Sequence, residues 1–163
     1  MDSTVTLVKL DSNNILPYKV KLLQSLNFHT DIIRATREKG LLQEIIKLTQ
    51  KNKTILYLLK KDAEIVGLIA LSASSIDEIP VIQVDYLFVD FRYRKQKIKE
   101  IDNSTISQYL LSFALNISEE VKQTIGLKYL ALYPDAQSDK LISHYKNMGF
   151  NPLNRYWLVI KLK

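Results

Sequence analysis

The chain has 163 residues, a net charge of +6 and no cysteine. Its length and its apolar fraction of 47% suit one compact domain that buries its own core. The absence of cysteine excludes disulfides, thiolate catalysis and zinc–thiolate sites. The positive charge favours an anionic ligand or partner without choosing one, because nucleotide cofactors, RNA, DNA and anionic membranes would all be attracted.

The chain shows no signal for export or membrane insertion. Its start, MDSTVTLVKL, begins with an acid and alternates at once, whereas a secretory signal has a basic and then a long apolar region. No apolar run approaches the roughly 20 residues that span a bilayer. We therefore expect a soluble, cytoplasmic protein.

The first half of the chain alternates between strand and helix patterns. Residues 4–10 alternate and predict a strand. Apolar residues at helical spacing predict helices over about 15–27 and 31–52, and Gly40 could break the second one. Residues 54–74 hold two aliphatic runs joined by the polar turn KKDAE, which predicts a β-hairpin.

The second half repeats this alternation. Residues 81–91 predict a long, buried strand, and after a basic segment an amphipathic helix follows, with an apolar stripe of Ile106, Leu110, Phe113, Ile117 and Val121. A strand over 127–133, a helix over 138–149 and a last strand over 155–162 complete the order. The order predicts an α/β fold in which one mixed sheet of about six strands is flanked by helices. We expect residues 1–163 to form a single domain.

The segment FVDFRYRKQKIKEID, residues 88–102, carries five cationic side chains: Arg92, Arg94, Lys95, Lys97 and Lys99. It joins a predicted strand to a predicted helix. Such a junction suits an anion, because the helix start offers unpaired N–H groups and the positive end of its dipole. Taken by composition alone, the segment is more typical of a solvated basic loop.

With this order of elements, the chain resembles the GNAT superfamily of acyl-CoA-dependent N-acetyltransferases. In that family a strand ending in valine is followed by tyrosine, arginine and a loop of the type Arg-x-x-Gly-x-Gly, whose backbone amides wrap the pyrophosphate of coenzyme A. Here the matching residues are Val89, Tyr93, Arg94, Gln96 and Ile98. The family's later Tyr-x-x-x-Gly-Phe ending is matched by Tyr145, Gly149 and Phe150. The resemblance covers residues 54–163, and earlier residues only in element order.

The resemblance implies a sheet that is splayed in the middle and a set of cofactor and catalytic residues. The end of the long strand would hold the pantetheine arm and polarise the thioester, and the loop and a later helix start would hold the phosphates of acetyl-CoA. These cofactor-binding residues are Leu87, Phe88, Val89, Arg94, Lys95, Gln96, Lys97, Ile98, Lys99 and Ser138. Tyr145 would be the general acid toward the thiolate, and Asp85 the general base where the family has a glutamate. No metal is implied.

Two departures from the family matter: both loop glycines are missing, and Ser138 and Leu141 stand where the family has the asparagine and alanine of an Asn-x-x-Ala motif. Lys97 and Lys99 replace both loop glycines, although glycine lets the backbone approach a phosphate closely and take a positive φ. Lysine side chains would then replace some amide contacts, as flexible point charges. The next residues, EIDNSTIS, are more than the family spends there and include good N-caps, which predicts a longer loop and a later helix start.

The resemblance implies transfer of an acetyl group from acetyl-CoA to a primary amine. The acceptor stays open between a small molecule, a peptide or protein lysine, and the amino group of an aminoacyl-tRNA, and a homodimer is allowed. The second half of the chain is similar to GNAT toxins that act on charged tRNA. Two alternatives remain: a degenerate member that keeps the fold as a binding module, and a basic nucleic-acid-binding domain.

Overall fold

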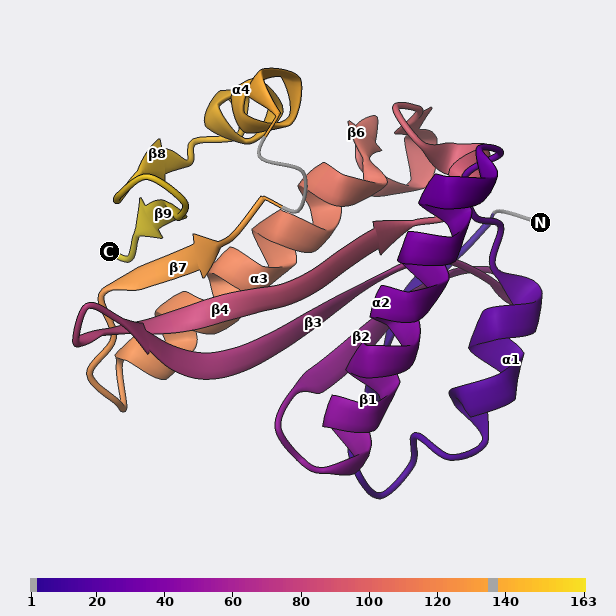
Figure 1. Cartoon of the computed structure of the whole chain (residues 1–163), viewed down its shortest axis with the longest axis horizontal. Coiled ribbons are helices and arrows are strands. Elements are labelled where there is room, and N and C mark those ends of the chain that lie inside the picture. The colour runs from indigo at the N-terminus through magenta and orange to yellow at the C-terminus, as the bar shows by residue number, and fades with distance from the viewer. Residues whose placement is uncertain (1–2, 135–137) are drawn as a thin grey trace. The chain divides into compact units, whose positions relative to one another are not determined.

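The computed structural model describes residues 3–134 and 138–163 (Figure 1). The strands are β1 (Val5–Leu10), β2 (Ile55–Lys61), β3 (Glu64–Ile76), β4 (Ile79–Val89), β5 (Lys97–Ile98), β6 (Ser104–Thr105), β7 (Tyr129–Leu132), β8 (Asn151–Pro152) and β9 (Leu158–Lys161). The helices are α1 (Tyr18–Ser25), α2 (Ile32–Gln50), α3 (Ile106–Lys122) and α4 (Asp139–Asn147), with short 3₁₀ turns η1 (Phe91–Tyr93) and η2 (Lys99–Ile101). The predicted order of long strands and helices is confirmed.

The large sheet has seven strands in the order β1-β2-β3-β4-β7-β9-β8, and β5 and β6 form a separate two-stranded pair. Strands β4 and β7 are parallel, and the pairs β1–β2, β2–β3, β7–β9 and β8–β9 are antiparallel. A mixed sheet flanked by helices is therefore confirmed, with the short β8 as the strand that the sequence did not predict. The ladder between β4 and β7 ends at the pair Val84↔Leu132, while β4 itself continues to Val89.

Contacts within the chain group it into two compact units. The first contains Met1–Leu71 and Asp85–Leu110, and the second contains Ser72–Val84 and Leu111–Lys163. The division passes through β3, β4 and α3. That residues 1–163 form a single domain remains a prediction.

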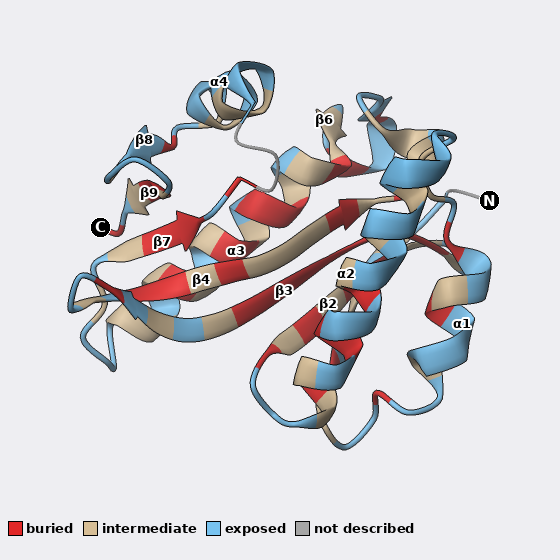
Figure 2. Cartoon of the chain, viewed as in Figure 1, coloured by how far each residue is buried: buried red, intermediate tan, exposed pale blue. Residues whose placement is uncertain are grey.

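The core of the first unit forms because alternate strand residues and one side of each helix are apolar. Leu56 and Leu58 of β2 and Leu68 and Ala70 of β3 point to the same face. That face packs against buried residues from the two helices, Leu22 of α1 and Leu42, Ile45 and Ile46 of α2. Helices α1 and α2 lie side by side (Figure 1), and buried residues run along β2 and β3 (Figure 2).

The opposite face of β3 meets the start of α3 at Gly67. A Cβ at this position would lie 2.8 Å from Ile106 Cγ2 and 3.1 Å from the Phe88 carbonyl oxygen. Glycine is therefore needed here for close approach rather than for a special φ. Next to it, the register between β2 and β3 skips Val66, whose carbonyl accepts a hydrogen bond from the Asp90 N–H at 2.9 Å.

The second unit has a smaller core. Buried Ile76, Val81, Ala131 and Val159 form it, and Trp157 is among the partly buried residues that pack against it. In α3 the buried positions include Leu111, Ala114 and Ser118, whereas Phe113 and Ile117 of the predicted stripe are only partly buried. Ser118 is tolerated inside because its hydroxyl donates to the Ala114 carbonyl at 2.7 Å.

Helix α2 differs from expectation in two ways. It runs unbroken through Gly40, where a Cβ would meet nothing within 4 Å. Ile32 and Ile33, which the sequence assigned to the apolar repeat, are both 78% exposed. Asp31 instead caps this end of the helix, accepting hydrogen bonds from the N–H groups of Ile33 and Arg34.

In the described part of the chain, no helix is long and apolar enough to cross a bilayer.

Two glycine substitutions should have opposite effects on stability. Gly67→Ala should lower the free energy of unfolding by about 1–3 kcal/mol, because the new methyl overpacks a buried contact with backbone and side chain. Gly40→Ala should raise it by up to about 1 kcal/mol, because alanine favours a helix interior and the site is open. Urea titration of both variants measures this. Equal destabilisation by the two would contradict the packing at Gly67.

Candidate functional site

The basic segment after β4 folds as a small hairpin rather than as a glycine-rich loop. Strands β5 and β6 pair antiparallel, with Lys97 opposite Thr105 and Ile98 opposite Ser104. Helix α3 then begins at Ile106. The longer loop and the later helix start are therefore confirmed. Ile98 and Ile101 are buried, so the hairpin is fixed to the body of the first unit by its own apolar side chains.

The backbone of this segment explains how it forms without glycine. Positive φ values occur at Lys95 (63°), Asp102 (56°) and Asn103 (58°). Lys97 lies in β5 and Lys99 in a 3₁₀ turn, and neither takes a positive φ. The positions where the family has glycine thus have backbone conformations that any residue adopts. Asparagine and aspartate are the side chains that best tolerate the left-handed region, which suits the turn.

The start of α3 uses some of its amides internally. The Thr105 N–H donates to Gln108 Oε1 at 2.9 Å, and the Gln108 N–H donates to Thr105 Oγ1 at 3.2 Å. This reciprocal pair is a capping box. Because it occupies two N–H groups that a phosphate could use, fewer backbone donors remain for an anion at this helix start.

The two arginines of the segment are engaged in ion pairs. Arg94 donates two hydrogen bonds to the Glu38 carboxylate of α2, both at 2.9 Å, and its Nε donates to the Val89 carbonyl at 2.9 Å. Its guanidinium also lies over the rings of Phe88 and Phe91. A phosphate contact by this side chain would have to replace a bidentate pair, which is the strongest form of ion pair.

Asp90 anchors the second arginine. Its carboxylate is fully buried and accepts hydrogen bonds from the backbone and side-chain N–H groups of both Asn27 and Arg92. Arg92 also pairs with Glu64, which accepts a hydrogen bond from the Tyr93 hydroxyl at 3.1 Å. Burial by itself would raise the pKa of the Asp90 carboxyl, but the hydrogen bonds from Arg92 and Asn27 outweigh it and lower that pKa below its usual value.

Sequence reasoning missed these anchoring residues, Asn27, Glu38, Glu64 and Asp90. Only Asp90 left a signal, because an acid directly after a buried strand and beside a basic run invites an ion pair. The partners come from distant parts of the chain, so no local pattern could have named them.

The lysines of the segment have a different environment. Lys95, Lys97 and Lys99 are exposed, and none has a carboxylate within ion-pair distance among residues 3–134 and 138–163. Gln96 is exposed too, but its side chain donates to the Arg92 carbonyl at 2.7 Å. Of the predicted phosphate-binding cations, the three lysines are therefore the ones available to an anion.

The end of β4 carries the other residues predicted for the first unit. Phe88 is buried against Phe28, with ring centroids 5.3 Å apart, while Leu87 and Val89 are partly exposed. Asp85 is also partly exposed, and its Oδ2 accepts a hydrogen bond from the buried Thr54 hydroxyl at 2.7 Å. Asp85 is thus held in place by a neutral donor rather than buried unsatisfied in the core.

The predicted residues of the second unit lie on α4. Ser138 caps this helix, and its Oγ accepts a hydrogen bond from the Leu141 N–H at 3.2 Å. Tyr145 is partly exposed, with its ring 6.0 Å from the Phe150 ring in an edge-to-face arrangement. The helix ends as predicted at a glycine, since Gly149 has a φ of 101°. The Tyr145 carbonyl accepts from the Phe150 N–H at 3.2 Å, which fixes Tyr145 and Phe150 together.

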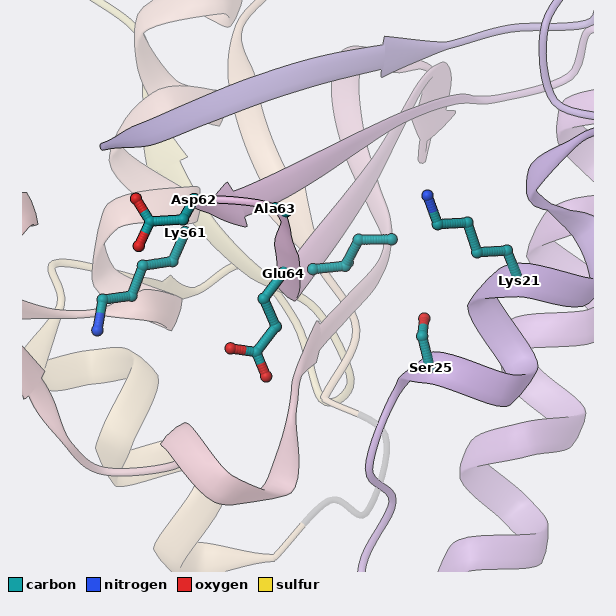
Figure 3. A pocket seen from close by; sticks show the side chains of 7 residues that line it. Lys21, Ser25, Lys61, Asp62, Ala63 and Glu64 are labelled. Atoms are coloured by element: carbon teal, nitrogen blue, oxygen red, sulfur yellow. The ribbon is translucent and has the colours of Figure 1, made fainter. Parts of the chain in front are cut away.

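An open hollow in the first unit lies elsewhere. Its lining comes from α1 and the turn between β2 and β3, and Figure 3 shows Lys21 and Ser25 across from Lys61, Asp62 and Glu64. Its volume is about 430 Å³. None of the residues predicted for cofactor binding or catalysis lines it. Because it mixes lysines with carboxylates, it shows no preference for an anion, and the exposed lysines of the basic hairpin are the better candidate.

No family model and no curated protein matches the chain. Solved structures do match. The crystal structure of AtaTR bound with AcCoA aligns with 97% of this chain and 93% of its own, at a TM-score of 0.72 and 16% identity. AtaT complexed with acetyl-methionyl-tRNAfMet aligns over 96% and 94%, at a TM-score of 0.71 and 16% identity.

A third structure is the AtaT toxin with a tyrosine-to-phenylalanine substitution, bound to acetyl-CoA and the C-terminus of the antitoxin AtaR. It aligns over 96% of this chain and 92% of its own, at a TM-score of 0.69 and 16% identity. These matches cover nearly the whole chain although the sequence identity is low, and they establish the fold. The chain has the GNAT-like α/β fold that its resemblance to the family implied.

The burial of the Asp90 carboxylate leads to a prediction about how stability depends on pH. Asp90→Asn should lower the free energy of unfolding at pH 7 by about 1–3 kcal/mol, because its donors lose part of their acceptor. Since the folded-state pKa lies below the unfolded value of about 3.8, the carboxylate stabilises the fold above that value, and this contribution is lost as the pH falls through the folded-state pKa. The difference between parent and variant should therefore shrink below about pH 4.

Urea titration across pH 3 to 7 measures this, with Asp77→Asn as the control, because Asp77 is exposed in the β3–β4 turn and asparagine tolerates its positive φ equally. A loss that is the same at every pH would show that the charge of Asp90 is not what stabilises the fold.

Proposed function

We propose that this protein transfers the acetyl group of acetyl-CoA to a primary amine. The observation that carries the proposal is the likeness, over nearly the whole chain, to structures of AtaT with acetyl-CoA bound. The exposed lysines of the basic hairpin and the position of Tyr145 next to the Gly149–Phe150 helix ending support it independently. Among amines we favour the amino group of an aminoacyl-tRNA, because AtaT has been solved with acetyl-methionyl-tRNA.

The cofactor would be held mainly by charge. Lys95, Lys97 and Lys99 would neutralise the pyrophosphate and the 3′-phosphate, while the capping box leaves fewer helix-start amides for them. Backbone groups of 87–89 would align the pantetheine arm along β4. Arg94 would contribute indirectly, because its pair with Glu38 fixes the chain between β4 and the hairpin.

The reaction needs three things from the protein. The amine must be neutral when its nitrogen attacks the thioester carbonyl, the oxygen of that carbonyl must be stabilised as it gains charge, and the departing sulfur must receive a proton. In our proposal, Asp85 takes the proton released by the amine, directly or through water. Tyr145 gives its hydroxyl proton to the thiolate as the carbon–sulfur bond breaks.

A second candidate is a degenerate binding module that keeps this fold, binds acetyl-CoA poorly or not at all, and transfers no acetyl group. The capping box at α3 favours it, because amides that would cradle a pyrophosphate already have partners. Thermal melting separates the two. Acetyl-CoA at about 100 times its dissociation constant should add nearly 3 kcal/mol of apparent stability. No shift at millimolar acetyl-CoA would leave the binding module as the better candidate.

The lysines should dominate cofactor affinity. The double variant Lys97→Ala, Lys99→Ala should bind acetyl-CoA about tenfold more weakly at low salt, and the difference should narrow as salt screens the charges. Isothermal titration at two salt concentrations measures this. The control is Lys51→Ala, Lys53→Ala, which removes two exposed lysines from the turn after α2. An affinity equal to that of the parent would place the phosphates elsewhere.

Tyr145→Phe should slow acetyl transfer about 10²-fold and leave acetyl-CoA affinity nearly unchanged, because a general acid acts in the transition state and the ring still packs on Phe150. The loss should appear equally in kcat and in kcat/KM. Tyr18→Phe, in α1, is the control for a tyrosine hydroxyl outside the proposed site. Unchanged turnover across the pH range would make Tyr145 a packing residue.

A further inference from the structure

An exposed aromatic stack lies in the second unit, outside the residues assigned above. Tyr133 and Tyr156 are 48% and 45% exposed, and their rings stack with centroids 6.0 Å apart and planes inclined by 19°. The rings of Trp157 and Tyr133 lie edge-to-face, with their centroids 5.4 Å apart. The guanidinium of Arg155 lies over the Tyr156 ring, 5.3 Å from its centroid. We call these four residues the aromatic stack.

Backbone hydrogen bonds and packing against the core fix the residues of the aromatic stack in place. The Oδ1 of Asn154 accepts hydrogen bonds from the N–H groups of Tyr156 and Trp157, both at 3.0 Å. The Leu153 N–H donates to the Trp157 carbonyl at 2.9 Å, and both residues pack against the core of the second unit. The rings are therefore placed before any ligand arrives, which reduces the entropy lost on binding.

The composition of the aromatic stack indicates which ligand it suits. Half-exposed rings leave apolar area in water, and a flat aromatic ligand would cover it while keeping the tyrosine hydroxyls solvated. Aromatic rings beside a guanidinium are what single-strand-binding proteins use, because every base has a face that stacks and the arginine contacts the backbone. The net charge of +6 suits the same polyanion.

The place of the aromatic stack in the chain fits a role near the acceptor. Tyr133 follows β7 directly, and the next helix is α4, which carries Tyr145. Tyr133 and Tyr145 belong to the same compact unit. An RNA segment held at Tyr133 would thus be held by the unit that supplies the proposed general acid.

We propose that the aromatic stack binds an unpaired nucleobase at the single-stranded end of an acceptor RNA. The choice of RNA rests on the proposed function. The adenine of coenzyme A has the same stacking chemistry, and the test below distinguishes the cofactor from RNA.

The test compares two fluorescein-labelled RNA hairpins, one blunt and one with a short unpaired 3′ overhang, by fluorescence anisotropy without acetyl-CoA. The overhang should strengthen binding to the parent protein about tenfold, because stacking one base on an aromatic ring has an effect of this size. Tyr133→Ala and Tyr156→Ala should abolish this gain. Tyr133→Phe and Tyr156→Phe should keep it, since stacking needs the ring and not the hydroxyl. Ile125→Ala, which removes a 62% exposed apolar side chain from the same unit, should also keep it.

Three results would overturn the proposal. The overhang could give no gain with the parent protein. The phenylalanine variants could lose the gain as fully as the alanine variants, which would indicate hydrogen bonding. In a separate isothermal titration, the alanine variants could lose affinity for acetyl-CoA while keeping the gain from the overhang, which would assign the rings to the adenine of the cofactor.

Circular dichroism melting checks that each variant folds. If an alanine variant does not fold, Tyr→Leu at the same position keeps the apolar bulk without the ring and should still lose the gain. Because binding is measured without acetyl-CoA, a protein that fails to transfer acetyl groups can still pass this test, and one that transfers them can fail it.

Discussion

The buried carboxylate of Asp90 is the interaction on which the rest of the candidate cofactor loop depends. A buried charge is costly unless it is paired and hydrogen-bonded, and here Asn27 and Arg92 each donate from backbone and side chain. Asn27 precedes α2 and Arg92 follows β4, so one carboxylate ties two distant segments together. Glu38 of α2 likewise connects two distant segments, because its carboxylate forms a bidentate pair with Arg94, which follows β4. The chain leaving β4 is thereby fixed before the hairpin begins.

This arrangement divides the basic segment into two parts with different roles. Each arginine has a planar guanidinium that forms an ion pair with a carboxylate of the same chain, and this pair fixes the arginine side chain in the structure. The lysines extend into water, where a flexible point charge can still neutralise a phosphate. A glycine loop binds pyrophosphate through fixed amides, which are weakly affected by salt. A loop that binds through lysines should have a higher association rate for its anionic ligand, and its affinity should fall more steeply as ionic strength rises.

The fold survives at 16% identity because it depends on patterns rather than on particular residues. Alternation along the strands and one apolar side on each helix are enough to specify the layers. Individual residues become necessary only where atoms crowd, as at Gly67, or where a charge is buried, as at Asp90. Such positions explain why sparse sequence similarity can accompany a match over nearly the entire chain.

Local sequence patterns were sufficient to predict the order of strands and helices, the α/β class, the late start of α3 and the glycine ending of α4. These follow from periodicity, caps and turn residues, which act over a few neighbouring positions. Which cations are available to a ligand depends on the packing of distant elements, because Glu38 and Glu64 reach the arginines from other parts of the chain. The same packing decides that Ile32 and Ile33 are exposed and Ser118 is buried, and that Tyr133 and Tyr156 stack. Burial and pairing between residues far apart in the chain depend on how the elements pack, which local patterns do not encode.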